Sequence, residues 1–407
     1  MKIIISILII SLLIITGCGE KPIPIDDSQA TADGIKQVVD ANNQFAFDLY
    51  KELNQEGNVF FSPYSISTAL AMTYEGAKGD TAKEIAEVFH FPEASILRLN
   101  TAKIYTEINK KDKSYKLHTA NALWAEKTYP FLATYLSTIE KYYGGKTTNL
   151  DFKNQPEASR KTINSWVEDK TNDKIKDLIP ARVINSMTRM VLTNAIYFKG
   201  TWLKEFDKEN TREMDFKITP DNMVKTDMMK LTGDEAKFNY AETNNLQIVE
   251  LLYDEEELSM IVLLPKEDLS SIEISTENLD KWKETLRHQR VNVYMPKFKF
   301  ETKYFMVKNL KNMGIKDAFI LGGADFSGMD GTDMLYIGDV IHQAFVEVNE
   351  EGTEAAAATA VVMKVGSAGP GSQIPVFMAD HPFIFLIQEK GTGNILFIGK
   401  VVNPTTN

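Results

Sequence analysis

Cysteine is nearly absent from this chain: a single Cys stands among 407 residues. One thiol excludes both a disulfide-stapled scaffold and a cysteine-rich zinc module. An excess of positive charge is also lacking, because 45 Lys and Arg oppose 56 Asp and Glu and the net charge is -11. Nucleic-acid binding needs a concentrated basic face, so this balance argues against it. With 43% apolar residues the chain is too hydrophobic to be disordered, and its length alone predicts two or three domains.

Signatures of catalysis are missing as well. The five histidines form no H-E-x-x-H or two-histidine metal spacing, and there is no G-x-S-x-G or G-x-x-x-x-G-K-[ST] motif. The glycine-rich residues 322–328 lack dinucleotide-binding spacing. Asp325, Asp330 and Asp333 miss the calcium-loop pattern and are expected to form a solvated turn. We therefore predict a protein that is not an enzyme and that uses no cofactor and no metal.

The N-terminus differs from the rest of the chain. Lys2 precedes an apolar run over residues 3–15, which is too short to span a bilayer and is typical of an export signal. The following Thr16-Gly17-Cys18 resembles a prokaryotic lipoprotein signal, which implies removal of residues 1–17 and lipid attachment to Cys18. An ordinary signal peptide that contains a cysteine is the alternative. Residues 18–31 are polar and turn-prone, so we expect a flexible tether there and a folded domain over residues 32–407.

Hydrophobic periodicity divides the domain into a helical first part and a strand-rich second part. Apolar residues at three- and four-residue spacing predict a helix from Ala32 to Leu53, and Ser62 followed by Pro63 predicts the start of a second helix. Helices are also expected over residues 81–89, 130–143 and 155–178, and strands over residues 190–198, 247–264, 291–300, 335–348 and 375–402. No obvious linker divides this series, which predicts an α+β fold.

Residues 345–375 are the most informative segment. An alternating strand ends at Glu350-Glu351-Gly352, small residues follow, and a stretch rich in Gly, Pro and Ser comes last. On alanine propensity, residues 354–360 would form a short exposed helix, although so short a helix is marginal by itself. As a strand, the segment would turn one set of side chains to the same face: Thr353, Ala355, Ala357, Thr359, Val361 and Met363. The first four are small, as a strand needs if it is to slide between existing strands over a packed core.

The stretch Glu350-Glu-Gly-Thr-Glu-Ala-Ala-Ala-Ala-Thr359 resembles the hinge of inhibitory serpins almost letter for letter. Further motifs follow in the order of that family: Asn58-Val-Phe-Phe-Ser62-Pro63, Asn194-Ala-Ile-Tyr-Phe-Lys-Gly-Thr-Trp202, Met295-Pro-Lys297-Phe298, Asp325-Phe-Ser-Gly328, His342, His381-Pro-Phe383 and Leu396-Phe-Ile-Gly-Lys-Val-Val-Asn-Pro404. The resemblance extends over residues 35–404.

The resemblance to serpins implies an α+β domain with three β-sheets, about nine surrounding helices and an exposed reactive-centre loop over residues 350–375. It implies an irreversible suicide inhibitor of serine proteases. The protease forms an acyl-enzyme on the loop, the cut hinge inserts into the main sheet, and the protease is distorted. Some members also trap papain-like cysteine proteases. The native state is then a kinetic trap. The alternative is a non-inhibitory, serpin-like surface binding protein, whose hinge would be expected to carry bulky, charged or Pro residues.

The same resemblance assigns roles to individual residues. The hinge comprises Glu350, Gly352, Thr353, Ala355, Ala357 and Thr359. Ser62, Asn194 and His342 should form a hydrogen-bonded shutter under the main sheet, and Trp202, Lys297 and Glu350 should lie at the breach, where the hinge enters. Without the resemblance, Ser62 would be a helix cap, Asn194 a polar group of a sheet and His342 a core histidine. Trp202 would be a core residue, and Lys297 with Glu350 a surface ion pair.

Counting along the loop as in the family places the scissile bond at Gly366-Ser367. Glycine offers a protease pocket nothing to fill, so Val365-Gly366 is the alternative. Val365 would suit elastase-like or subtilisin-like enzymes, and Lys364 would suit trypsin-like ones. The expected partners are serine proteases of these classes and, through Cys18, a membrane. We expect no nucleic-acid partner, a monomer, and a lipid-anchored location in the extracellular space or on the outer face of the cell membrane.

Overall fold

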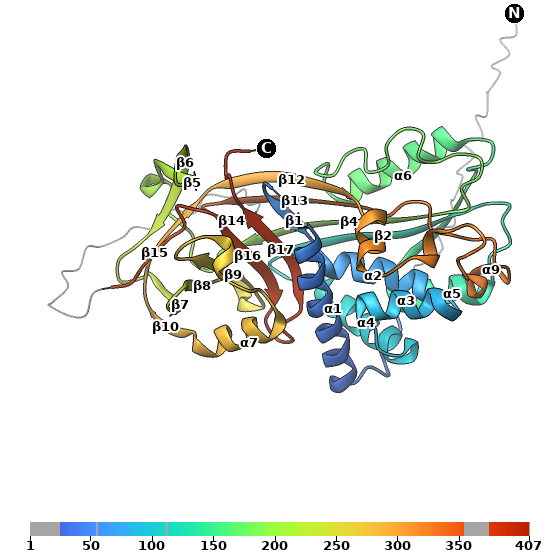
Figure 1. Cartoon of the computed structure of the whole chain (residues 1–407), viewed down its shortest axis with the longest axis horizontal. Helices are drawn as coiled ribbons and strands as arrows, with labels where there is room; N and C mark the ends of the chain where they lie inside the picture. Colours follow the sequence, from blue (N-terminus) through green and yellow to red (C-terminus); the bar gives the residue numbers. More distant parts are fainter. Residues whose placement is uncertain (1–24, 54–55, 111–112, 354–373, 407) are drawn as a thin grey trace, which may run out of the picture.

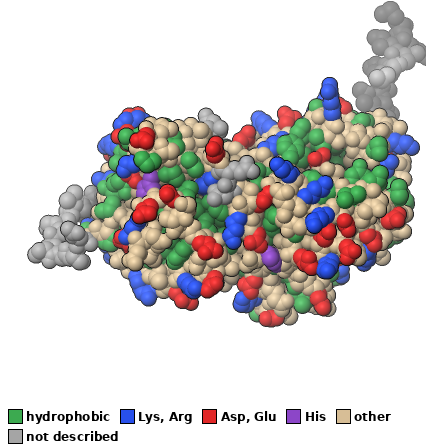
Figure 2. Space-filling view, viewed as in Figure 1, with side chains coloured by type: hydrophobic (Ala, Val, Ile, Leu, Met, Phe, Trp, Pro, Cys, Tyr) green, Lys and Arg blue, Asp and Glu red, His purple; other side chains and the backbone are tan. Residues whose placement is uncertain are grey.

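The computed structural model describes residues 25–53, 56–110, 113–353 and 374–406. Within these ranges three β-sheets and nine α-helices form an α+β fold (Figure 1), which confirms the predicted fold class. No helix of the described ranges is long and apolar enough to cross a membrane. Figure 2 shows Lys and Arg side chains interspersed with Asp and Glu on the visible face.

Six of the nine helices in the described ranges lie before residue 171, with one long strand, residues 116–126, among them. Ser62 caps α2, since its Oγ accepts a hydrogen bond from the Ser65 N–H at 3.1 Å, and Pro63 takes the first helical position as predicted. The helices are α1 Ala32–Leu53, α2 Pro63–Tyr74, α3 Gly79–Phe89, α4 Ala94–Ile108, α5 Ala133–Tyr143, α6 Pro156–Lys170, α7 Thr276–Thr285, α8 Val307–Met313 and α9 Ser327–Asp330.

The main sheet has six strands in the order β12-β13-β14-β4-β2-β3. Its long strands run across the molecule in Figure 1, with α6 on one side and α2 to α5 on the other. The strands are β2 Lys116–Glu126, β3 Lys146–Leu150, β4 Met190–Thr201, β12 Phe298–Phe305, β13 Ile341–Asn349 and β14 Gly352–Thr353.

The chain forms two further sheets besides the main sheet. The seven-stranded sheet has the order β1-β17-β16-β9-β8-β7-β10, and every residue of β9 is buried. Its strands are β1 Val59–Phe61, β7 Lys237–Glu242, β8 Leu246–Leu252, β9 Leu258–Pro265, β10 Arg287–Arg290, β16 Phe383–Glu389 and β17 Ile395–Val401. The four-stranded sheet consists of β15 Val376–Met378, β11 Asn292–Pro296, β6 Asn222–Leu231 and β5 Arg212–Thr219.

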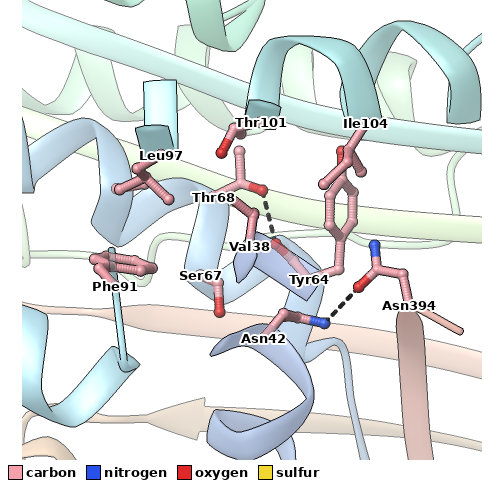
Figure 3. Close-up of a pocket in the computed structure, with 11 residues that line it drawn as sticks. Val38, Asn42, Tyr64, Ser67, Thr68, Phe91, Leu97, Thr101, Ile104 and Asn394 are labelled. Carbon is pink, nitrogen blue, oxygen red and sulfur yellow. Dashed lines mark hydrogen bonds between the residues drawn. The ribbon is translucent and has the colours of Figure 1, made fainter. Parts of the chain in front are cut away.

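Polar contacts join the helices to the last β-hairpin (Figure 3). The Asn42 amide on α1 donates to Asn394 Oδ1 at 2.8 Å, and Thr68 Oγ1 donates to the Tyr64 carbonyl within α2 at 2.8 Å. These residues line a small cavity of about 20 Å³, together with side chains of α4 such as Leu97 and Thr101. The first of these contacts fixes α1 to the turn before β17.

Several boundaries differ from the sequence predictions. The helix expected over residues 155–178 ends at Lys170, because Asn172 and Asp173 take positive φ angles of 50° and 59°. The strand expected over residues 247–264 is the pair β8 and β9, and the strand expected from residue 335 begins at Ile341. Residues 291–300 hold β11 and β12, and residues 375–402 hold β15, β16 and β17. The helix α4, the strand β2 and the hairpin of β5 and β6 were not predicted from the sequence.

The expected solvated turn holds at Asp333, which is exposed, but was wrong for Asp330. Asp330 is 7% exposed, and its carboxylate accepts hydrogen bonds from the Tyr129 hydroxyl at 2.5 Å and the Thr332 N–H at 2.7 Å. The buried Asp330 carboxylate therefore fixes the start of an exposed turn. Nowhere in the described ranges do three His, Cys, Asp or Glu side chains gather as a metal site would require.

Candidate functional site: the hinge and the main sheet

The hinge enters the main sheet at β14. Gly352 and Thr353 lie antiparallel to β4, opposite Thr201 and Gly200, and on their other side they pair with Asn349 and Val348 of β13. Two residues of the hinge thus occupy the gap between two strands of the sheet.

Further along the sheet the gap is closed. His342, Gln343 and Ala344 of β13 pair directly with Asn194, Ala195 and Ile196 of β4. Any deeper insertion of the hinge must break this parallel pairing, which therefore forms a barrier beneath Thr353.

Thr353 points into a pocket of aromatic side chains. It is 2% exposed, and its Oγ1 lies 2.7 Å from the Tyr253 hydroxyl. Burial raises the pKa of Tyr253, so the hydroxyl stays protonated. Tyr253 stacks on Trp202 with ring centroids 4.6 Å apart and an interplanar angle of 19°. A polar pair enclosed by aromatic rings fixes the side chain of Thr353 beneath the sheet surface.

Gly352 is required by close backbone approach. A Cβ atom at this position would lie 2.0 Å from the Gly200 carbonyl oxygen and 2.8 Å from Thr201 Cα. No side chain fits between the hinge and β4 here, and this explains why the motif has a glycine at position 352.

Backbone hydrogen bonds hold the residues just before β14. The Trp202 N–H donates to the Glu351 carbonyl at 2.9 Å, and the Phe206 N–H donates to the Glu350 carbonyl at 2.8 Å. The Trp202 indole Nε1 donates to the Asn349 carbonyl at 3.0 Å. The segment that follows β4 therefore supports the hinge through three bonds to consecutive residues.

Glu350 lies at the predicted breach with Lys297. Its side chain is 5% exposed; Oε2 lies 3.2 Å from Lys297 Nζ, and Oε1 accepts from Thr211 Oγ1 at 2.8 Å. Burial alone would raise the pKa of Glu350, but hydrogen bonds from its own N–H and Thr211, together with Lys297, lower the pKa below its ordinary value. Glu351 forms a second ion pair, with Lys208.

The three predicted shutter residues come together beneath the barrier. The Ser62 N–H donates to His342 Nε2 at 3.1 Å, and His342 Nδ1 lies 3.2 Å from Asn194 Oδ1. Burial lowers the pKa of His342 to about 3, so the ring is neutral at physiological pH, with Nε2 accepting and Nδ1 donating.

The shutter extends to neighbouring elements. Ser62 Oγ donates to the Leu396 carbonyl at 2.6 Å, and the Asn194 amide donates to the Ser65 carbonyl at 2.6 Å and to Asn121 Oδ1 at 2.8 Å. The network therefore ties α2 to β4, β2 and β17 under the direct pairing of β4 with β13.

Comparison with known proteins identifies the family. Residues 40–404 match the family model described as "Serpin (serine protease inhibitor)". The chain belongs to the serpin family. This confirms the resemblance found in the sequence.

Relatives and solved structures agree with this assignment. An uncharacterized serpin-like protein of Methanosarcina acetivorans is 43% identical, over 99% of both chains. The leukocyte elastase inhibitor of Xenopus tropicalis is 41% identical and covers 91% of this chain and 100% of the relative. The structure of uncleaved ovalbumin has a TM-score of 0.79 at 35% identity and covers 90% of this serpin and 100% of that chain.

Several predicted sites of this serpin lie outside the described residues. They are Cys18 and the signal over residues 1–17, the hinge residues Ala355, Ala357 and Thr359, and the bonds Gly366-Ser367 and Val365-Gly366. Of the proposed tether, only residues 25–31 are described, and this part is not a free tether: Asp26 pairs with Lys141 of α5 at 2.9 Å and Asp27 with Lys103 of α4 at 3.3 Å.

Several residues that support the hinge were not predicted from the sequence. Tyr253 follows β8 and Asn121 lies within β2, and neither carries a local pattern that indicates contact with Thr353 or with Asn194. Lys208 and Thr211, which bind Glu351 and Glu350, come from the turn before β5. Only the folded sheet brings these positions together.

Proposed function

We propose that this serpin is an irreversible suicide inhibitor of serine proteases. The observation that supports the proposal is the position of Gly352 and Thr353, paired on both sides within the main sheet. A hinge that has begun to enter the sheet can continue by adding one residue pair after another, once the loop beyond it is cut.

The chemistry belongs to the protease. Its serine Oγ attacks the carbonyl carbon of Gly366, the Gly366-Ser367 peptide bond breaks, and the proton passes to the leaving amine of Ser367. The ester that joins Gly366 to the protease is the acyl-enzyme. The freed hinge then inserts and moves the bound protease along the sheet before water reaches the ester. Val365-Gly366 is the second candidate bond. Subtilisin-like, elastase-like and trypsin-like proteases are the proposed targets, and papain-like cysteine proteases could be trapped through the corresponding thioester.

The described contacts define what insertion must overcome. The pairing of residues 342–344 of β13 with residues 194–196 of β4 must separate, and the shutter bonds between Ser62, His342 and Asn194 cross that line. The inserting strand gains a ladder of backbone hydrogen bonds on both edges, at positions where Ala355, Ala357 and Thr359 offer little steric resistance.

We further propose that the chain acts outside the cell. Residues 1–17 would be removed, Cys18 would carry a lipid, and the residues between Cys18 and Asp26, which binds Lys141 of the domain, would join the monomeric domain to the outer face of the cell membrane. Detergent partitioning of the expressed protein tests the anchor: wild type should enter the detergent phase, and Cys18→Ser should not.

The function is tested by mixing the purified domain with subtilisin, elastase and trypsin. An SDS-stable complex should form with at least one of them, while Thr353→Arg should be cleaved without forming it, because a long charged side chain cannot take the place of Thr353 beside Tyr253. Cleavage of wild type without any complex would contradict inhibition. If loop cleavage also left the melting temperature unchanged, a non-inhibitory binding protein would be the better description.

A further inference from the structure

A cavity of about 220 Å³ lies beside the breach, between the segment after β4 and the edge of the seven-stranded sheet. Its apolar walls come from Trp202, Phe206, Phe238 and Leu251, all of them buried. Leu203 and Leu252 extend the wall toward solvent. The chamber is large enough for a small organic molecule and suits one with an aromatic or aliphatic body.

Positive side chains predominate around this cavity. Lys204, Lys237 and Lys390 line it with His288, while Glu250 and Glu256 are its acidic residues. Lys204 Nζ lies 5.6 Å from the centre of the Phe238 ring and donates to the Lys237 carbonyl at 2.8 Å; burial lowers the pKa of Lys204.

The two remaining lysines are available to a ligand. Among the described residues neither the Lys237 nor the Lys390 ammonium has a hydrogen-bond or ion-pair partner. Glu250, in contrast, is 7% exposed and accepts from the Asn239 amide at 2.7 Å. A ligand anion would therefore meet two uncommitted cations among the lining residues, and the Glu250 carboxylate would accept a hydrogen bond from a donor on the ligand.

The cavity wall is also the support of the hinge. Trp202 and Phe206 line the cavity, and their backbone N–H groups hold the carbonyls of Glu351 and Glu350. Trp202 stacks on Tyr253, whose hydroxyl contacts Thr353. A molecule packed against Trp202 and Phe206 would restrict the motion of the segment that holds the hinge in the sheet.

We propose that this cavity is a binding site for a small amphipathic organic anion, such as an aromatic carboxylate or sulfonate, and that its occupancy holds the hinge in the position described above. The binding claim stands on the cavity alone. The coupling claim rests on Trp202 and Phe206, which line the cavity and also hold the hinge, and its bearing on inhibition rests on the proposed function. By thermodynamic linkage, a ligand that stabilises this hinge position also binds more tightly to the protein when the hinge is in this position.

Binding is tested with 8-anilinonaphthalene-1-sulfonate, an aromatic anion that fluoresces in apolar surroundings. We expect saturable binding with one site per chain, weakened about threefold to tenfold by Lys237→Glu and by Lys390→Glu. Lys161→Glu is the matched control, since Lys161 is exposed on α6 at the far end of the molecule in Figure 1, and it should leave binding unchanged. Binding that neither cavity variant weakens, or tighter binding of the cationic dye thioflavin T, would overturn the proposal.

Coupling to the hinge is tested without any protease. At saturating dye, hydrogen exchange in the peptides that contain residues 200–206 and 349–353 should slow by at least threefold, while α6 should exchange as before. Dye bound with no change in exchange would refute the coupling. Failure to inhibit proteases would leave this result intact, so the two proposals fail separately.

Discussion

Gly352→Ala tests the fit of the hinge in the main sheet. The new methyl group would lie 2.0 Å from the Gly200 carbonyl oxygen, on backbone atoms of β4 that cannot rotate aside. Either β4 shifts or the hinge leaves the sheet. We expect the hinge to leave, because β14 is only two residues long, whereas β4 pairs with β2 over ten positions.

The expected cost follows from the contacts of Thr353. Leaving the sheet breaks its hydrogen bond to Tyr253 and leaves the Tyr253 hydroxyl without a partner, which destabilises the native state by about 1–3 kcal/mol. In a domain of this size that lowers the melting temperature by about 1–4 °C.

The assay is thermal unfolding at one fixed scan rate, combined with hydrogen exchange at residues 349–353. Gly338→Ala is the matched control, because a Cβ at Gly338 meets no atom within 4 Å. Gly352→Ala should also be cleaved as a substrate more often than it inhibits, since a fully inserted hinge would keep the same clash. A melting temperature and hinge exchange equal to those of Gly338→Ala would refute the steric argument.

Three further predictions follow from the same contacts. Tyr253→Phe removes the partner of Thr353 Oγ1 and should lower stability by about 1–2 kcal/mol in chemical denaturation, whereas Tyr336→Phe on the surface should not. The pKa of His342 is depressed to about 3, so its contribution to stability is complete above pH 6.5 and is lost as pH falls toward 3; melting temperatures from pH 8 to pH 4.5 should therefore fall less steeply in His342→Gln than in wild type. Lys297→Met leaves Glu350 with two hydrogen-bond donors, Thr211 and its own N–H. Because Lys297 is 37% exposed, the variant should lose about 1 kcal/mol of unfolding free energy or less, and it should be as stable as wild type at high salt.

Local sequence signals predicted the parts of the structure that local physics determines. Ser62 and Pro63 set the start of α2, and the small inward side chain expected at Thr353 is indeed buried. The meeting of Ser62, Asn194 and His342 followed from the family resemblance, since nothing in their separate surroundings indicates it.

The position of the hinge could not be predicted from its own residues. It depends on where β13 and β4 diverge and on Tyr253, which lies 100 residues away in the chain. The helix α4 was not predicted because its sequence lacks the usual signals of a helix start. Glu93 makes no side-chain capping bond, and no acidic residue stands in the first turn. The cavity beside Trp202 is likewise formed by segments that only the folded sheets bring together.

Mass spectrometry of the SDS-stable complex with subtilisin tests the central claim most directly. The account predicts one covalent species whose mass is that of the protease plus this chain without residues 367–407, with Gly366 esterified to the protease serine. Two cleaved fragments beside free and active protease, with no covalent species at any ratio of the two proteins, would contradict it.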